Sequence, residues 1–547
     1  MLFAINASAE TVVGVTSFNN LSKNTKYTWE NLLNYTTNIG KNSISALLGH
    51  SMYKNVYEFS RSEGDAGKEH YYLSSFYDVK KISTPVVTTG FTQSSMLSYF
   101  GRINYSYDGK YLLTASVRAD GTSPLAAGNK WGYFPSLSGA WRVSDEAFMA
   151  GTEGWLSNLK MRASWGISGN AAIEPYQTLS QLSGYDVFYY MGAKDIAGRI
   201  PSQMGNPELK WETTQALNYG IDFGFFDNRI SGSIDYYTSH TYDLLFLRTA
   251  PPSQVFTTVL SNVGETKGRG LEIALNTLVA KTKDFSYDIN WSYSTGKDEI
   301  VGLTSGIDKY QVSGQEWLIV GQPVRIFYDF ETNGIWNVGE FAQFKTDWEG
   351  RHPGETLNYV ANGAPAGYGN PGTMKIVDVN DDGIIDGDDK KVFDRTAKHI
   401  LGMNNTISFK NIALSFLLYA RMGGVIAYDL NNQMNYETAN WGDLDYWTPA
   451  NTEAKFPSPG AASAVYSSYG TSLRYEKADF FKIKDITLSY SIPSTVLKNI
   501  HISNLRVFGS LKNYFTFSAI PNYDSERGGS ISFPLAKQAV VGLNLEF

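Results

Sequence analysis

An apolar–polar alternation of period two runs through this sequence almost from end to end. In the stretch "LLTASVRAD", Leu113 and Val117 alternate with Thr114 and Ser116, and an Asp-Gly pair at Asp108 precedes the stretch. Alternation of this kind predicts a strand with one apolar face, and Asp-Gly between two such runs is a strong hairpin signal. The chain is therefore predicted to be all-β.

The same alternation recurs along the rest of the chain, in residues 134–144, 159–168, 215–237, 269–294, 481–492, 505–517 and 540–547. These segments predict about sixteen strands, each about ten residues long. Helical periodicity with caps appears nowhere over a useful length. The aromatic share of 14% and the 51 glycines suit strands and turns better than helices.

The polar positions of the alternating segments carry charges, at Arg102, Arg118, Arg142, Lys160, Arg162, Glu272, Asp288 and Lys482. A large soluble all-β protein, either a propeller or a string of sandwiches, would turn these charges toward water. A membrane β-barrel would turn the apolar face to lipid and the polar face to its lumen, with aromatic residues at both interfaces. We favour the barrel, with long loops at 172–210, 300–400 and 422–472 on one side of the membrane.

Composition excludes several other classes. The formal charge of −7 and the absence of cysteine argue against a nucleic-acid binder, a disulfide framework and a cysteine-based zinc site. No run approaches the length of a transmembrane helix. The start, "MLFAINASAE", lacks the basic region of a secretory signal, so we expect either a cytoplasmic protein or one whose natural N-terminal part is missing.

Several long segments resemble the SusC/RagA-type TonB-dependent outer-membrane transporters. They include "GRINYSYDGKYLLTASVRADGTS", "KWGYFPSLSGAWRVSDEAFM", "NPELKWETTQALNYGIDFGFFDNRISGSIDYY", "NVGETKGRGLEIALN" and "RYEKADFFKIKDITLSYSIP". They follow the family order from about residue 97 to 547, and residues 25–60 resemble an earlier hairpin. The resemblance implies a barrel of roughly twenty-two strands, of which residues 1–547 are a partial, C-terminal portion. The signal, the plug domain and the first strands of the family are not found.

The resemblance also implies a function. Such transporters import oligomeric nutrients, glycans or peptides, across the cell outer membrane. A SusD-like surface lipoprotein is their lid, and the TonB complex acts on the part that is missing here. The final strand, with Val541, Leu543, Leu545 and Phe547 on its apolar face, is expected to pair in the outer-membrane lipid and to be read by the barrel-assembly machinery. The alternatives are a secreted soluble β protein that binds or cleaves glycans, and a passive porin.

One acidic motif, "DVNDDGIIDGDD", has the oxygen spacing of an EF-hand-type or dockerin-type calcium loop. Its predicted ligands to a structural Ca²⁺ are Asp378, Asn380, Asp382, Ile384 through its carbonyl, Asp386 and Asp389. The alternative interpretation is a solvated acidic turn.

No catalytic motif is present: the six histidines form no metal-ligand pair, and no nucleophile elbow or phosphate loop is found. The chain is therefore predicted not to be an enzyme. Aromatic residues of the expected long loops could stack on sugars or clamp peptides, and the candidates are Trp336, Trp441, Tyr446 and Trp447. Loop packing is the alternative role for each ring.

Overall fold

The computed structural model describes residues 16–65, 83–191, 194–249, 258–303, 306–428, 445–459, 465, 468–497, 502–520, 523–530 and 535–546. Two compact units can be distinguished. The first comprises Met1–Gly139, Ser164–Ala216 and Thr241–Gly264, and the second comprises Ala140–Ala163, Leu217–His240 and Glu265–Phe547.

A sheet of fifteen strands is the main element, in the order β1-β2-β3-β4-β5-β6-β9-β10-β13-β14-β21-β22-β25-β26-β27. The strands are β1 (Thr16–Ile39), β2 (Asn42–Asp65), β3 (Ser83–Tyr107), β4 (Tyr111–Thr122), β5 (Trp131–Arg142), β6 (Leu156–Asn170), β9 (Glu212–Phe225), β10 (Ile230–Tyr242), β13 (Glu265–Lys281), β14 (Phe285–Gly302), β21 (His399–Phe409), β22 (Ile412–Met422), β25 (Phe480–Ser491), β26 (Asn504–Ser518) and β27 (Gln538–Glu546). Most strands that neighbour each other in the sheet are also consecutive in the chain. The described residues form mainly strands, so the all-β prediction is confirmed.

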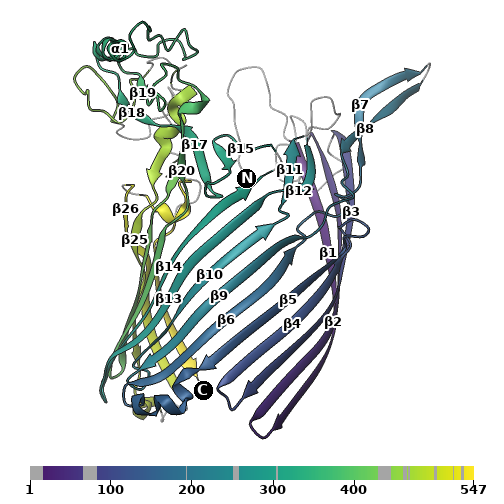
Figure 1. Ribbon diagram of the computed structural model, residues 1–547, viewed down its shortest axis with the longest axis vertical. Coiled ribbons are helices and arrows are strands. Elements are labelled where there is room, and N and C mark those ends of the chain that lie inside the picture. Colours follow the sequence, from purple (N-terminus) through teal and green to yellow (C-terminus); the bar gives the residue numbers. More distant parts are fainter. Residues whose placement is uncertain are drawn as a thin grey trace. The chain divides into compact units, whose positions relative to one another are not determined.

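Tight turns join the strands at the places where the sequence predicts them. β1 and β2 form the hairpin expected at residues 25–60, with Ile39 opposite Asn42, and Figure 1 shows β2 beside its other neighbour, β3. Between β3 and β4, Asp108 and Gly109 both have positive φ, 53° and 68°. The backbone N–H of Lys110 donates to the Tyr107 carbonyl at 3.0 Å, and two consecutive residues with positive φ at the centre are what a turn of the Asp-Gly type requires.

Exposure along the strands is opposite to that of a soluble sandwich. In β4 the apolar side chains Leu113 and Val117 are 47% and 51% exposed, whereas Thr114 and Ser116 between them are less exposed. At the end of the strand, Asp120 is buried. An apolar face this open in water would be costly, so the pattern indicates a lipid-facing surface with polar groups turned inward.

The prediction of sixteen strands is close, but the main sheet has fifteen. Within the described residues, the other strands form small separate sheets, two of which lie in the connection from β14 to β21. The other three sheets pair β7 (Gln181–Met191) with β8 (Lys194–Gln203), β11 (Leu245–Thr249) with β12 (Thr258–Asn262), and β23 (Val425–Ala427) with β24 (Tyr475–Lys477). β7 and β8 lie in the expected long loop 172–210, whereas β11, β12 and β24 lie outside the expected loops. The strands β11, β12, β23 and β24 have only three to five residues each, too few for alternation to be recognised.

The connection from β14 to β21 is an ordered region of the second unit, which we call the insertion and define as residues 306–398. It contains β15 (Lys309–Ser313), β16 (Glu316–Ile319), β17 (Ile326–Phe330), β18 (Thr332–Ile335), α1 (Glu340–Arg351), β19 (Met374–Ile376) and β20 (Lys390–Asp394). Figure 1 shows α1, β18 and β19 beyond one end of β14.

Helix α1 contradicts the prediction that no useful helix is present. Its N-cap is Gly339, with a φ of 78° and no side-chain cap, so the usual Ser, Thr, Asp or Asn signal is missing. In its place, the Glu340 side chain accepts a hydrogen bond from the backbone N–H of Asn337, at 2.9 Å. Among the described residues, no helix combines the length and apolar character needed to cross a lipid bilayer.

A hydrophobic cluster fixes the insertion in place. Ten of its sixteen buried residues come from the insertion and six from the segment 445–473. Met374 and Trp348 are almost completely buried within it. In the first unit, a smaller cluster is formed by Leu125, Ile173, Leu209 and Trp211. Each cluster buries apolar side chains that do not face the lipid.

Candidate functional site

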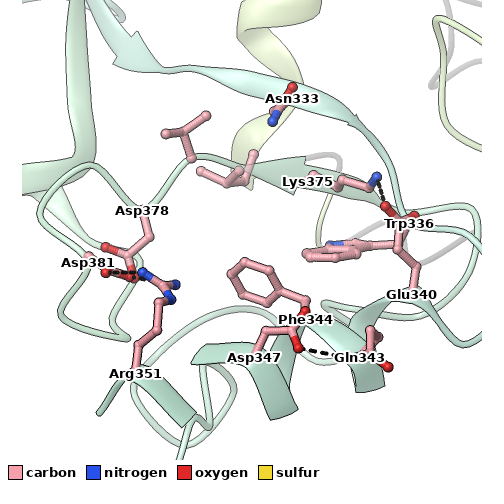
Figure 2. A pocket seen from close by; sticks show the side chains of 12 residues that line it. Asn333, Trp336, Glu340, Gln343, Phe344, Asp347, Arg351, Lys375, Asp378 and Asp381 are labelled. Atoms are coloured by element: carbon pink, nitrogen blue, oxygen red, sulfur yellow. Dashed lines mark hydrogen bonds and ion pairs between the residues drawn. The ribbon is translucent and has the colours of Figure 1, made fainter. Parts of the chain in front are cut away.

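A cavity of about 590 Å³ lies in the insertion and is the candidate site. Residues of β18, α1 and β19 and of the acidic loop line it, and Figure 2 shows their side chains pointing toward a common space. A volume in this range is typical of sites for small ligands.

Two ion pairs stand at the edges of the cavity. Lys375 of β19 pairs with Glu340 of α1. At the other end of the helix, Arg351 binds Asp381 with an Nη1–Oδ2 distance of 2.6 Å. Both cations of the lining are therefore neutralised by neighbouring carboxylates (Figure 2).

Two aromatic rings form one wall of the cavity. The centroids of Trp336 and Phe344 lie 5.4 Å apart, at an interplanar angle of 59°. The Lys375 ammonium lies 5.3 Å from the centroid of the Trp336 ring, close enough for a cation–π attraction. Phe344 is half-buried, so part of its ring borders the cavity.

One face of α1 supplies polar groups beside the Phe344 ring, which belongs to the same helix. Gln343, Asp347 and Arg351 are spaced four residues apart and so lie on the same side of the helix. The Gln343 amide donates a hydrogen bond of 2.8 Å to the Asp347 carboxylate. These residues, with Asn333 and Lys375, are site residues that the sequence analysis missed, and the four-residue spacing is the signal that could have found three of them.

The acidic loop folds around hydrogen bonds between its own carboxylates and backbone N–H groups. Asp378 accepts from the backbone N–H of Asp382 and Gly383, at 3.2 and 2.9 Å. Asp389, which is completely buried, accepts from Val379 and Asp386, at 2.7 and 2.8 Å. Gly383 has a φ of 77°, which is the conformation that glycine adopts most readily.

The remaining predicted ligands lie in the same loop. The Asn380 amide donates to Asp382 at 2.9 Å, Ile384 is half-buried, and Asp386 is exposed. Within the described residues, no group of three or more His, Asp or Glu side chains is placed to hold a metal ion. The six residues thus share one loop, and calcium binding stays a prediction.

Burial changes the acidity of several groups around the cavity. It raises the pKa of the Asp389 carboxyl despite the two backbone N–H donors. It also raises the pKa of Tyr359, reinforced by the negative charge of Asp378, to which the Tyr359 hydroxyl donates at 3.1 Å. For Glu340, burial opposes ionisation, but hydrogen bonds from Lys375 and Asn337 outweigh it and lower the pKa. Glu340 is thereby held as a carboxylate and Tyr359 as a neutral phenol.

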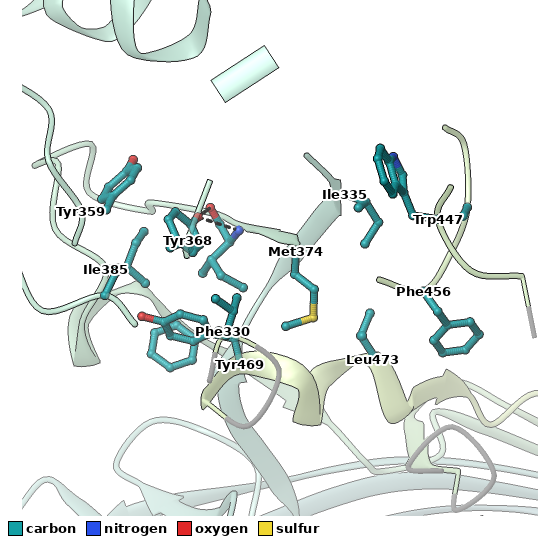
Figure 3. Close-up of a cluster of buried hydrophobic side chains, with 14 of the residues drawn as sticks. Phe330, Ile335, Tyr359, Tyr368, Met374, Ile385, Trp447, Phe456, Tyr469 and Leu473 are labelled. Carbon is teal, nitrogen blue, oxygen red and sulfur yellow. Dashed lines mark hydrogen bonds between the residues drawn. The ribbon is translucent and has the colours of Figure 1, made fainter. Parts of the chain in front are cut away.

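The structure places the predicted aromatic residues in different surroundings. Trp336 borders the cavity, but only 4% of its surface is exposed. Trp447 packs inside the hydrophobic cluster near Ile335 (Figure 3), and its indole N–H donates to Asn337 at 2.7 Å. Burial of this kind corresponds to loop packing. Tyr446 is 43% exposed, and Trp441 lies outside the described residues.

The polar face of the sheet carries ion networks at two predicted positions. Arg162 binds Asp222 through its Nε and Nη2 atoms and reaches Asp235 at 3.0 Å. Lys482 is completely buried and pairs with Asp524 and Glu526. The charges of Arg162 and Lys482 are therefore satisfied by partners from neighbouring strands or loops, as a buried charge requires.

The predicted apolar face of the last strand is also found. Val541 and Leu543 of β27 are 84% and 64% exposed, and Leu545 is 38% exposed. The strand pairs antiparallel with β26, with Leu545 opposite Leu505. Phe547 lies outside the described residues, and recognition by the assembly machinery stays a prediction.

Comparison with known proteins identifies the class. The sequence profile of the family described as "TonB dependent receptor-like, beta-barrel" matches residues 5–514. The chain therefore belongs to the TonB-dependent receptor β-barrel family, whose members are outer-membrane transporters and not enzymes. The exposed apolar strand faces described above agree with that location.

The relatives include curated receptors and a solved transporter. TonB-dependent receptor P26 of Formosa agariphila is 30% identical over 549 residues, covering 95% of this chain and 53% of the relative. TonB-dependent receptor SusC of Bacteroides thetaiotaomicron is 30% identical over 469 residues, covering 83% of this chain and 44% of SusC. The RagAB peptide transporter shares the fold, with a TM-score of 0.78 at 24% identity, over 97% of this chain and 56% of that chain.

These matches confirm the SusC/RagA-type resemblance. The chain spans about half the length of the curated relatives it matches.

Proposed function

We propose that the whole protein imports an oligomeric nutrient, a glycan or a peptide, across the outer membrane. The observation that carries this proposal is the match of residues 5–514 to the TonB-dependent receptor β-barrel family. The similarity to SusC, and the fold shared with a peptide transporter, support the two substrate classes. The polar inward face with its ion networks suits a route for hydrated substrates.

We infer two partners for the complete transporter. A SusD-like surface lipoprotein would close over the substrate, and the TonB complex would supply energy from the inner membrane. The similarity to SusC and to RagAB supports both partners. The alternation of exposed apolar and enclosed polar side chains in β4 disfavours the secreted soluble alternative.

Uptake by the host cell tests this function. We expect a strain lacking the gene to lose uptake of at least one labelled oligosaccharide or peptide from a mixed set, and a plasmid copy to restore it. Dissipating the proton gradient should abolish the restored uptake, because the energy comes from that gradient. Unchanged uptake of every probe in the deletion strain, or uptake that survives loss of the gradient, would contradict active import.

We propose a structural Ca²⁺ for the acidic loop, with the six predicted oxygen ligands. The positive φ of Gly383 and the shared placement of Asp378, Asp382 and Asp386 in one loop support it. Calcium at a hundred times its dissociation constant would stabilise the folded protein by about 2.7 kcal/mol. We expect the melting temperature of the purified protein to rise with Ca²⁺ and to fall back with a chelator.

Asp382→Asn should reduce this calcium response, because it removes one carboxylate from the predicted ligand set. The matched control is Asp388→Asn in the same loop, since Asp388 is exposed and is outside that set. If neither Ca²⁺ nor a chelator changes the melting temperature of the wild-type protein, the loop is a solvated acidic turn and the calcium proposal is wrong.

A further inference from the structure

Among the described residues that line the cavity of the insertion, neither cation is free for an anionic ligand. Of its charged lining, Arg351 is bound by Asp381 at 2.6 Å and Lys375 is bound by Glu340. Asp347 forms no ion pair within the part of the chain that the structure describes, and its side chain is exposed. A carboxylate or sulfate ligand would meet net negative charge here, and like charges at short range repel.

The polar groups of the lining that form no ion pair suit a ligand that both donates and accepts hydrogen bonds. The Asp347 carboxylate accepts only, and the Asn333 amide can do both. The indole N–H of Trp336 is buried and interacts with the Tyr368 hydroxyl, so it is not available to a ligand. An ammonium group donates only, so it would leave the N–H groups of Asn333 unsatisfied, whereas a hydroxyl group can donate to Asp347 and accept from Asn333.

The aromatic wall and the size of the cavity also suit a sugar. The half-buried Phe344 ring presents an apolar surface beside these polar groups (Figure 2). A volume of about 590 Å³ lies within the range of small-ligand sites and suits one or two sugar rings. A pyranose offers hydroxyl groups around its edge and C–H groups on its faces, which matches a site with polar groups beside an aromatic ring.

We propose that this cavity binds an uncharged sugar unit of a glycan and is a substrate subsite of the insertion. Asp347 and Asn333 would bind hydroxyl groups, and Phe344 would contact the apolar face of the ring. The proposal rests on the proposed import function, and it selects neutral glycans from the two substrate classes.

Direct binding tests the subsite on the full-length protein purified in detergent. The probes for calorimetric titration are maltoheptaose, xylohexaose, mannohexaose and laminarihexaose as neutral glycans, hexagalacturonate as an acidic glycan, and penta-alanine as a peptide. We expect at least one neutral glycan to bind and hexagalacturonate not to bind. Asp347→Asn should weaken that binding by about ten-fold or more, because a hydrogen bond to a charged group is lost.

Phe344→Leu should weaken binding by about two- to ten-fold, since the ring contact is lost while an apolar side chain remains. Glu355→Gln is the matched control and should bind like the wild type, because Glu355 is exposed in the same insertion and is not part of the cavity lining. All variants should keep the wild-type melting temperature within the error of the measurement.

Three results would overturn the subsite: no binding of any neutral glycan, binding of penta-alanine that the Asp347→Asn variant loses, or glycan binding that this variant keeps in full. Uptake by cells separates this failure from failure of the import function. Cells that import a neutral glycan at the same rate with wild-type protein and with Asp347→Asn would refute the subsite alone. Cells that import no probe through the wild-type protein would refute import itself.

Discussion

Replacing Lys482 with methionine is expected to destabilise the second unit by about 3–5 kcal/mol, which is the usual cost of leaving a buried charge without its partner. The lysine side chain is completely buried and contacts both Asp524 and Glu526. Without the ammonium, two carboxylates would remain close together in a poorly solvated place. We expect the helical turn η8 (Ser525–Arg527) to detach, with faster amide hydrogen exchange at its backbone.

A neighbouring lysine is the control for this substitution. Lys484 also binds Glu526, at 2.6 Å, but its side chain is 39% exposed, so water can replace the lost contact. Lys484→Met should therefore cost less than about 1 kcal/mol. The triple variant Lys482→Met, Asp524→Asn, Glu526→Gln should recover much of the lost stability, since no uncompensated charge remains. Slow exchange at η8 in the single Lys482→Met variant would contradict the assigned role of the ion network.

Introducing arginine on the apolar face of β27 is the second substitution with a large expected effect. Leu543 is 64% exposed and lies on the face assigned to lipid. Arginine near the middle of the bilayer costs a barrel about 2–4 kcal/mol, so Leu543→Arg should reduce the amount of folded, outer-membrane protein. Heat-modifiable migration on a denaturing gel reports the folded fraction.

The adjacent position provides a control in the same strand. Asn544 projects from the other face of β27, because successive side chains of a strand alternate. Asn544→Arg should leave the folded fraction close to that of the wild type. Equal losses from both substitutions, or a greater loss from Asn544→Arg, would contradict the assignment of the lipid-facing side.

The strands could be predicted because the sequence pattern of a strand depends on residues close together in the chain. The Asp108-Gly109 turn, the hairpin around residues 25–60 and the exposed face of Leu113 and Val117 follow from period two and from turn chemistry, and the structure confirms them. Successive side chains of a strand point to opposite faces, so the residues of the strand itself show which side chains share a face. The fold class therefore needed no knowledge of distant contacts.

The insertion and its cavity were not predictable in the same way. Helix α1 lacks a side-chain N-cap. Its polar residues line a site only because the chain brings β19 beside the helix, where Lys375 pairs with Glu340. The cavity joins Trp336 to Lys375 and Asp378, about forty residues further along the chain. The sequence pointed to Trp336 because of its aromatic ring and to Asp378 because of the calcium-loop spacing. That both line one cavity depends on tertiary packing, which short-range sequence patterns do not reveal.

The hydrophobic cluster built from two connections has a mechanical consequence. Because ten of its residues belong to the insertion and six to the segment 445–473, neither connection can swing away alone without exposing the interior of both. We therefore expect the two connections to move together, so that displacement of one is transmitted to the other. The junction with β22 is held as well, because the backbone N–H of Gly423 donates to Asp479 and the Gly424 carbonyl accepts from Ala478 at 3.1 Å. Both glycines have positive φ, 86° and 82°, and lie against the backbone of residues 395–398, where a larger side chain would not fit.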